Sequence, residues 1–136
     1  MVSRLTRTGP NFFEPTVLAD VTDDMKIARE ETFGPVAPIF KFQSEDEVID
    51  RANNVSVGLA SYVFSQDIGR VARVSESLQV GMVAVNTGVI SDAAAPFGGV
   101  KQSGLGREGS RHGMDDYMQL KTIVTGNVDV KYRALL

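Results

Sequence analysis

The pattern of apolar and polar positions is clearest after residue 43, where apolar residues recur at helical spacing. Ser44 and Glu47 form a capping-box pattern, which is typical of the start of a helix. The apolar residues that follow lie on one face of that helix, and the Asn53-Asn54 pair with Gly58 marks its end. We therefore predict a helix that begins after Ser44 and ends at this pair.

Short apolar segments around this helix predict strands at residues 36–42, 60–64 and 80–85. Ser65 is expected to cap a second helix, whose apolar residues continue to Leu78. Strands and helices thus alternate with short links, which favours a parallel sheet with helical crossovers over a sandwich or a bundle. The expected fold class is α/β.

The ends of the chain carry weaker signals. Four further elements are expected there: a strand at 16–21, a helical turn at 23–30, a short helix at 107–112 and a strand at 117–124. Gly126-Asn127 is a candidate hairpin turn, because the residues that follow it alternate between apolar and charged.

Composition restricts the class of protein. The 136 residues are 43% hydrophobic and 23% charged, as expected of one globular domain or part of a larger one. A net charge of −3 supplies no basic surface for nucleic acid. No apolar run approaches the roughly 20 residues that cross a bilayer, and the first residues lack the apolar core of a secretory signal. We therefore expect a cytoplasmic protein with no membrane or nucleic-acid partner.

The chain contains no cysteine. Disulfides, cysteine-ligated metal sites and catalysis by a thiolate of this chain alone are therefore excluded. His112 is the only histidine, and no metal-ligand spacing surrounds it, so we interpret it as a solvent-facing residue at a helix end. No metal site is expected.

Glycine is concentrated in one region, since eight of the thirteen glycines lie between Gly81 and Gly113. Only glycine adopts positive φ freely and leaves room beside the main chain, so this region has the character of the rim of a site. Residues 104–109 match the G-x-G-x-x-G pattern of dinucleotide-binding folds, but residues 101–103 before them indicate a loop instead of the required strand. The match is therefore interpreted as accidental.

Other candidates have a simpler structural interpretation when spacing alone is considered. Glu30-Glu31 ahead of Phe33 could bind vicinal hydroxyls, but a charged helix end before a turn is favoured. Ser91-Asp92 is typical of a turn, and Arg107 and Glu108 could simply pair with each other or cap the turn that follows them. These patterns by themselves predict an α/β segment with a glycine-rich rim and leave its chemistry open.

Taken together, several motifs resemble the C-terminal part of the aldehyde dehydrogenase superfamily. They run in order from about Gly9 to Thr125, and they are FFEPTVL at 12–18, EETFGPV at 30–36, NN at 53–54 with GLA at 58–60, GMVAVN at 81–86 and PFGGVKQSGLGRE at 96–108. Residues 86–91 and 109–117 resemble succinate-semialdehyde dehydrogenases most.

The resemblance implies a role for four residues. Glu31 is similar to the carboxylate that accepts hydrogen bonds from the nicotinamide ribose, and Phe33 to the aromatic beside the nicotinamide ring. Ser91 would donate to the distal carboxylate of succinic semialdehyde, and Phe97 would line the aldehyde tunnel. The glycines at 98, 99, 104 and 106 are expected to shape the loop.

In this family a cysteine thiolate attacks the aldehyde, hydride passes to NAD or NADP, and a glutamate-activated water releases the acid. The cysteine and the glutamate belong to sequence upstream of the matched part, so the resemblance places no catalytic residue here. We expect residues 15–116 to be part of a catalytic domain, after an irregular lead-in at 1–14, with an oligomerisation-type strand and tail at 117–136. The parent enzyme would be a homo-oligomer that oxidises succinic semialdehyde.

The chain alone is expected to be inactive and to bind no cofactor tightly. A non-enzymatic association module that keeps the inherited fold is the alternative. A stand-alone nucleotide binder ranks below both, because Glu31 and Phe33 come without a phosphate cradle and ribose contacts alone bind weakly.

Overall fold

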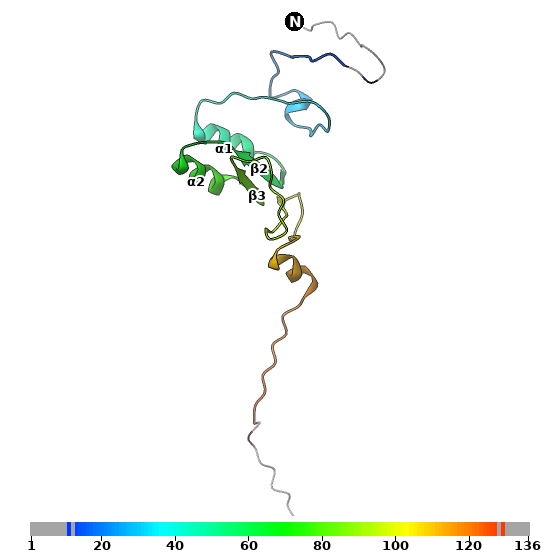
Figure 1. Ribbon diagram of the computed structural model, residues 1–136, viewed down its shortest axis with the longest axis vertical. Helices are drawn as coiled ribbons and strands as arrows, with labels where there is room; N and C mark the ends of the chain where they lie inside the picture. Colours follow the sequence, from blue (N-terminus) through cyan, green and yellow to red (C-terminus); the bar gives the residue numbers. More distant parts are fainter. Residues whose placement is uncertain (1–10, 12, 128, 130–136) are drawn as a thin grey trace, which may run out of the picture. The chain divides into compact units, whose positions relative to one another are not determined.

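A computed structural model describes residue 11, residues 13–127 and residue 129 (Figure 1). The chain divides into two compact units, residues 1–47 and 48–136, and each is described by itself. The elements in chain order are η1 (Lys26–Ala28), α1 (Glu45–Asn53), β1 (Val57–Gly58), β2 (Ala60–Val63), α2 (Ile68–Ser77), β3 (Met82–Val85), β4 (Val100–Lys101) and η2 (Arg111–Tyr117).

The centre of the second unit is a β2–α2–β3 crossover. Strands β2 and β3 pair in parallel, with Ala60 opposite Met82 and Val63 opposite Val85, and α2 packs against β2 (Figure 1). Three apolar side chains of this crossover are buried, namely Val71, Met82 and Ala84. The strands predicted at 60–64 and 80–85 and the helix between them are therefore present.

The prediction of a mostly parallel sheet is not confirmed beyond this one pair. The other sheet of the described residues is also two-stranded, and its strands, β1 and β4, run antiparallel. β1 is two residues long and directly precedes β2, and β4 lies within the glycine-rich region, so neither was expected from the pattern.

The capping box of α1 is confirmed in its main feature. The Ser44 hydroxyl accepts a hydrogen bond from the backbone N–H of Glu47 at 3.1 Å. The Glu47 carboxylate accepts one from the N–H of Gln43 at 2.7 Å, one residue before the cap. Both bonds satisfy donors near the helix start that have no partner within the helix.

The cap predicted for α2 is wrong by two residues. Asp67, not Ser65, is the N-cap, and its carboxylate accepts a hydrogen bond from the backbone N–H of Arg70 at 3.0 Å. The Ser65 hydroxyl accepts instead from the N–H of Asp67 at 3.2 Å. Serine and aspartate are both favoured caps, so composition alone could not choose between them.

The cap makes the stability of α2 dependent on pH. The hydrogen bond from the Arg70 N–H lowers the pKa of Asp67 below its usual 3.8. A carboxyl whose pKa is lowered by folding stabilises the folded state above pH 3.8, and this contribution disappears as the pH falls through the lowered pKa. We expect D67N, whose amide also caps but does not titrate, to lose less helical circular dichroism than the parent below that pH. An equal loss in both proteins would contradict the prediction.

Two asparagine side chains stabilise the crossover by hydrogen bonds to the main chain on either side of α2. Asn86 accepts from the N–H of Ser65 and donates to its carbonyl, both at 2.9 Å, directly after β3. Asn53, at the end of α1, donates to the carbonyl of Ser77 at 2.8 Å and accepts from the N–H of Gln79 at 2.8 Å. Each side chain thus connects two segments that lie more than twenty positions apart in the sequence.

Several elements expected near the ends are absent from the described residues. Residues 16–21, 36–42 and 117–124 have no ladder partner, and the turn expected at 23–30 is reduced to η1. The short C-terminal helix begins at Arg111 and continues through Tyr117, so it occupies part of the predicted strand. The hairpin at Gly126-Asn127 lies partly outside the described residues, as does most of the lead-in.

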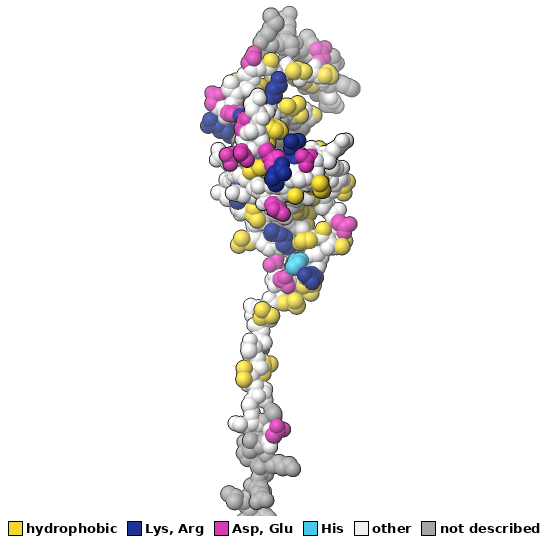
Figure 2. Space-filling model, turned by 90° about the vertical axis from the view of Figure 1, so that its left-hand side faces the viewer, with side chains coloured by type: hydrophobic (Ala, Val, Ile, Leu, Met, Phe, Trp, Pro, Cys, Tyr) yellow, Lys and Arg dark blue, Asp and Glu magenta, His cyan; other side chains and the backbone are white. Residues whose placement is uncertain are grey.

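Large apolar side chains are widely exposed in both units, and Figure 2 shows many on the viewed face. Phe33 is 94% exposed in the first unit, and Leu105 and Leu120 are fully exposed in the second. Few apolar side chains of the described residues are buried. Within the described part, no helix combines the length and the apolarity needed to cross a membrane.

Candidate functional site

The glycine-rich segment is held against the crossover by main-chain pairing. Val100 lies opposite Gly58, and Lys101 lies opposite Val57 in the antiparallel pair of β4 and β1. The hydroxyl of Ser103 accepts a hydrogen bond from the N–H of Gly58 at 2.9 Å. This pairing places the first half of the segment beside the start of β2.

The two halves of the segment also pair with each other. Phe97 and Glu108 form an isolated antiparallel bridge, with N–H to carbonyl distances of 2.8 Å and 2.7 Å. Close to this bridge, Nη1 of Arg107 donates to the carbonyls of Gly99 and Gly106 at 2.8 Å and 2.7 Å. The segment is therefore a closed loop. Its first arm is residues 97–99, its second arm is residues 106–108, and Phe97 lies at the end of the first.

Both basic residues of the segment bind main-chain carbonyls. Nζ of Lys101 donates to the carbonyl oxygens of Asn53 and Val55 at 2.7 Å and 3.1 Å, where α1 ends. A cation at the C-terminal end of a helix is favourable because it satisfies carbonyls and complements the helix dipole. Lys101 and Arg107 thus fasten the loop in this structure, and neither is arranged as part of a phosphate cradle.

Glycine is required where the loop meets the strand β3. A Cβ on Gly81 would collide with the carbonyl oxygen of Gly98 and would lie 2.7 Å from the Cα of Gly99. Gly106 has φ +81°, a backbone conformation that strains any other residue, and it lies beside the carboxylate of Asp116. The expected role of Gly106 in shaping the loop agrees with this geometry.

An open cavity of about 620 Å³ lies between the loop and η2. Its side-chain lining includes Leu59, Phe97, Arg107, Met114 and Tyr117. Phe97 is half-buried at this wall. The mixture of an aromatic, apolar groups and a cation on concave main chain is typical of a binding wall.

The four site residues implied by the resemblance fall into two groups. Glu31 and Phe33 lie in the first unit, and both are exposed. Ser91 and Phe97 lie in the second unit, where Phe97 lines the cavity and Ser91 does not. Their roles stay predictions, and the structure describes each pair within its own unit.

The loop that carries Ser91 is attached to the turn before η2. Asp92 forms a turn in which its carboxylate accepts from the N–H of Ala94 at 2.7 Å. The next carbonyl, that of Ala93, accepts from the N–H of Ser110 at 3.0 Å. A turn thus begins at Asp92, as the sequence indicated, and it is bonded to Ser110, which follows the glycine-rich segment.

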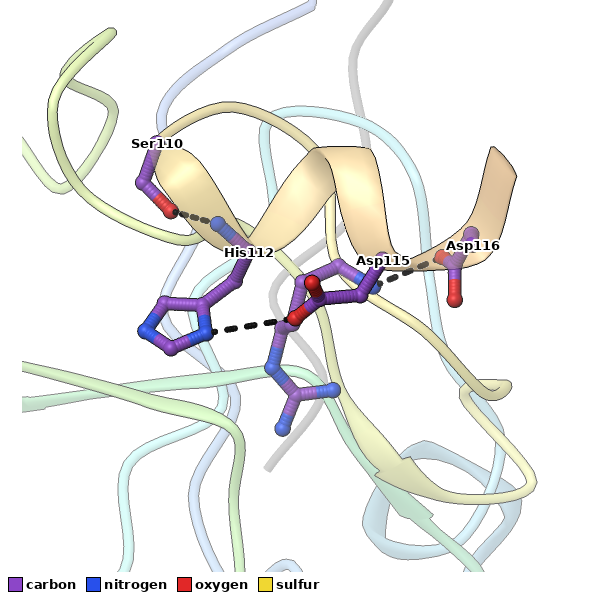
Figure 3. A network of polar contacts seen from close by, with 5 residues as sticks. Ser110, His112, Asp115 and Asp116 are labelled. Carbon is purple, nitrogen blue, oxygen red and sulfur yellow. Dashed lines mark hydrogen bonds and ion pairs between the residues drawn. The ribbon is translucent and has the colours of Figure 1, made fainter. Parts of the chain in front are cut away.

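Helix η2 carries the polar contacts shown in Figure 3. The hydroxyl of Ser110 accepts from the N–H of His112 at 3.1 Å, and Nδ1 of His112 lies 3.6 Å from a carboxylate oxygen of Asp115. Asp116 accepts from the N–H of Arg107 at 3.3 Å (Figure 3). His112 is exposed, as expected, but it lies near the start of η2 and not at the end of the predicted helix at 107–112. No group of three residues able to hold a metal occurs in the described part of the chain.

Sequence reasoning missed the residues that hold the loop in place, chiefly Lys101 and Arg107, and Asn86, which bonds the end of β3 to Ser65. Their partners are main-chain groups, which leave no periodic pattern in the sequence, whether they lie 48 positions away, as for Lys101, or eight, as for Arg107. The available signal was a pair of basic residues among glycines, because closely packed main chain needs donors for its buried carbonyls.

Comparison with known proteins adds an independent result. The model of the aldehyde dehydrogenase family matches residues 3–123. A 3-sulfolactaldehyde dehydrogenase of Pseudomonas putida is 64% identical over 121 residues, which are 89% of this chain and 25% of that protein. The chain therefore spans about a quarter of the length of the curated relatives it matches.

Solved structures agree in fold. A succinate-semialdehyde dehydrogenase of Burkholderia pseudomallei has a TM-score of 0.74 and 59% identity, covering 86% of this chain and 24% of that one. An NAD+ complex of an aldehyde dehydrogenase of Bacillus cereus has a TM-score of 0.71 and 50% identity, covering 75% of this chain and 21% of that one. Because the family match extends over most of the residues and the fold agrees, the chain belongs to the aldehyde dehydrogenase family.

Proposed function

We propose that this chain supplies one wall of the aldehyde channel and the ribose contact of an NAD(P)-dependent dehydrogenase that oxidises succinic semialdehyde to succinate. The observation that carries the proposal is the closed loop at 96–108, which presents Phe97 to a concave cavity in a chain that matches the family over residues 3–123. A solved relative with 59% identity is named for succinate semialdehyde, which supports this substrate.

The residues proposed to contact the cofactor fit its chemistry. The carboxylate of Glu31 is exposed and has no partner among the described residues, so both its oxygens can accept hydrogen bonds from the two hydroxyls of a ribose. Two positions later, Phe33 presents a ring that is 94% exposed and can pack against a flat heterocycle. NAD or NADP, when bound, accepts the hydride released from the aldehyde carbon.

On the substrate side, this chain orients and encloses the aldehyde. Phe97 would present an apolar wall to the aldehyde chain and exclude water from it. The hydroxyl of Ser91 would donate a hydrogen bond to the distal carboxylate of the substrate. The thiolate that attacks the carbonyl carbon must belong to sequence other than these 136 residues, because they include no cysteine.

The proposal is tested with the chain alone and with a chimera. The purified chain, given NAD+ or NADP+ and succinic semialdehyde, is expected to form no reduced cofactor above background. A chimera in which this chain replaces the corresponding quarter of the Burkholderia pseudomallei enzyme is expected to regain aldehyde-dependent reduction. Turnover by the chain alone would overturn the first expectation, and a well-folded chimera without turnover would overturn the second.

A second candidate substrate is 3-sulfolactaldehyde, because a relative named for it is 64% identical to this chain. Both aldehydes carry an anionic group distant from the reacting carbon, a carboxylate in one and a sulfonate in the other. The ratio of kcat/KM for the two aldehydes in the chimera decides between them. The association module is not favoured, since the relatives compared above are named as dehydrogenases.

A further inference from the structure

The charged side chain of Arg107 donates its hydrogen bonds to main-chain carbonyls. Its side chain is half-buried and lines the cavity together with Phe97. Nη1 donates to Gly99 on the first arm of the loop and to Gly106 on the second, at 2.8 Å and 2.7 Å. No carboxylate of the described residues forms an ion pair with the guanidinium. The guanidinium therefore binds main-chain carbonyls of both arms and not a carboxylate.

The joined segment is otherwise easily deformed. Gly98 and Gly99 follow Phe97 directly, and glycine loses more conformational freedom on folding than any other residue. The stem of Arg107 lies over Gly98, since a Cβ there would approach its Cδ to 2.8 Å. Hydrogen bonds from a charged donor contribute about 1.5–3 kcal/mol, which is enough to select one conformation of so short an arm.

We propose that Arg107 is a positioning residue that fixes the direction of the Phe97 side chain at the wall of the aldehyde channel. This inference rests on the proposed function for the identity of the channel. Phe97 is bonded at both its N–H and its carbonyl to Glu108, and Arg107 holds the arm two residues further on. With the backbone fixed on both sides, the Cα–Cβ bond of Phe97 has one direction.

An arginine suits this role better than a lysine. The planar guanidinium presents several N–H groups in a fixed geometry, so one group can reach two carbonyls that face it. A lysine ammonium at the same position is a compact charge on a flexible stem. R107K should therefore restore part of the effect lost in R107M.

The test uses the whole chain with 4-fluorophenylalanine placed at position 97 only. R107M is compared with R111M, in which an exposed arginine four positions away is removed. In R107M we expect a changed and broadened fluorine NMR signal and about tenfold faster hydrogen exchange at the Phe97 amide, since tenfold corresponds to about 1.4 kcal/mol. R111M should match the parent, and R107K should lie between the parent and R107M.

The exchange of the β3 amides, from Met82 to Val85, separates a local effect from a global one. Unchanged β3 exchange with altered Phe97 signals supports positioning. An unchanged Phe97 signal in R107M, or equal acceleration at Phe97 and in β3, overturns it. If R107M does not fold, the same comparison made with R107K decides.

In the chimera, R107K is expected to raise KM for the aldehyde while KM for the cofactor stays constant. An equal change in both constants would overturn positioning at the channel wall. The fluorine and exchange measurements do not depend on enzyme activity. They therefore test the positioning role of Arg107 even if the proposed function is wrong.

Discussion

Replacing Gly81 with alanine is expected to destabilise the second unit by about 3 kcal/mol, the upper part of the range for inserting a group into packed structure. The added methyl group would collide with the carbonyl oxygen of Gly98 and would lie 2.8 Å from its carbonyl carbon. These are backbone atoms, which cannot rotate away as a flexible side chain can. The loop must therefore move, and its pairing with β1 and with its own second arm is strained.

The matched control is Gly88→Ala, because no atom lies within 4 Å of a Cβ built on Gly88. Substitutions at such sites change stability by no more than about 0.5 kcal/mol. Urea unfolding followed by circular dichroism gives both free energies of unfolding, and hydrogen exchange at the amides of Phe97 and Glu108 shows whether the bridge opens. Similar midpoints for the two variants would show that the loop adapts to a side chain at Gly81.

Replacing Glu31 with glutamine in the chimera is expected to raise KM for NAD+ or NADP+ about tenfold, which corresponds to about 1.4 kcal/mol. Glutamine keeps one acceptor oxygen but loses the charge and the second oxygen, so it can no longer accept from both hydroxyls of a ribose. The expected loss lies at the lower end of the range for charged hydrogen bonds because the site faces water.

The control for this variant is Glu30→Gln, which removes the same charge one position earlier from a residue that is also exposed. A general electrostatic effect on an anionic cofactor would appear equally in both variants, whereas a ribose contact would appear only in E31Q. KM for the aldehyde should stay unchanged in both. Equal KM values for the cofactor in E30Q and E31Q would assign the ribose contact to another residue.

The sequence by itself determined the elements whose signals are local. The capping box at Ser44 and Glu47, the apolar spacing of two helices and the apolar runs of β2 and β3 all depend on residues within a few positions of one another. The order of the family motifs likewise sufficed to identify the family. The cluster of glycines between Gly81 and Gly113 also indicated that the main chain bends there or lies close to another group.

Only the tertiary structure decided how the glycine-rich segment closes. The bonds from Arg107 to Gly99 and from Lys101 to Asn53 join segments through carbonyls that every residue possesses. The sequence therefore does not show which carbonyl will accept a given hydrogen bond. The predicted strand at 117–124 is not confirmed for the complementary reason. A strand exists only where another segment offers its edge; Tyr117 ends η2, and no described segment pairs with residues 118–124.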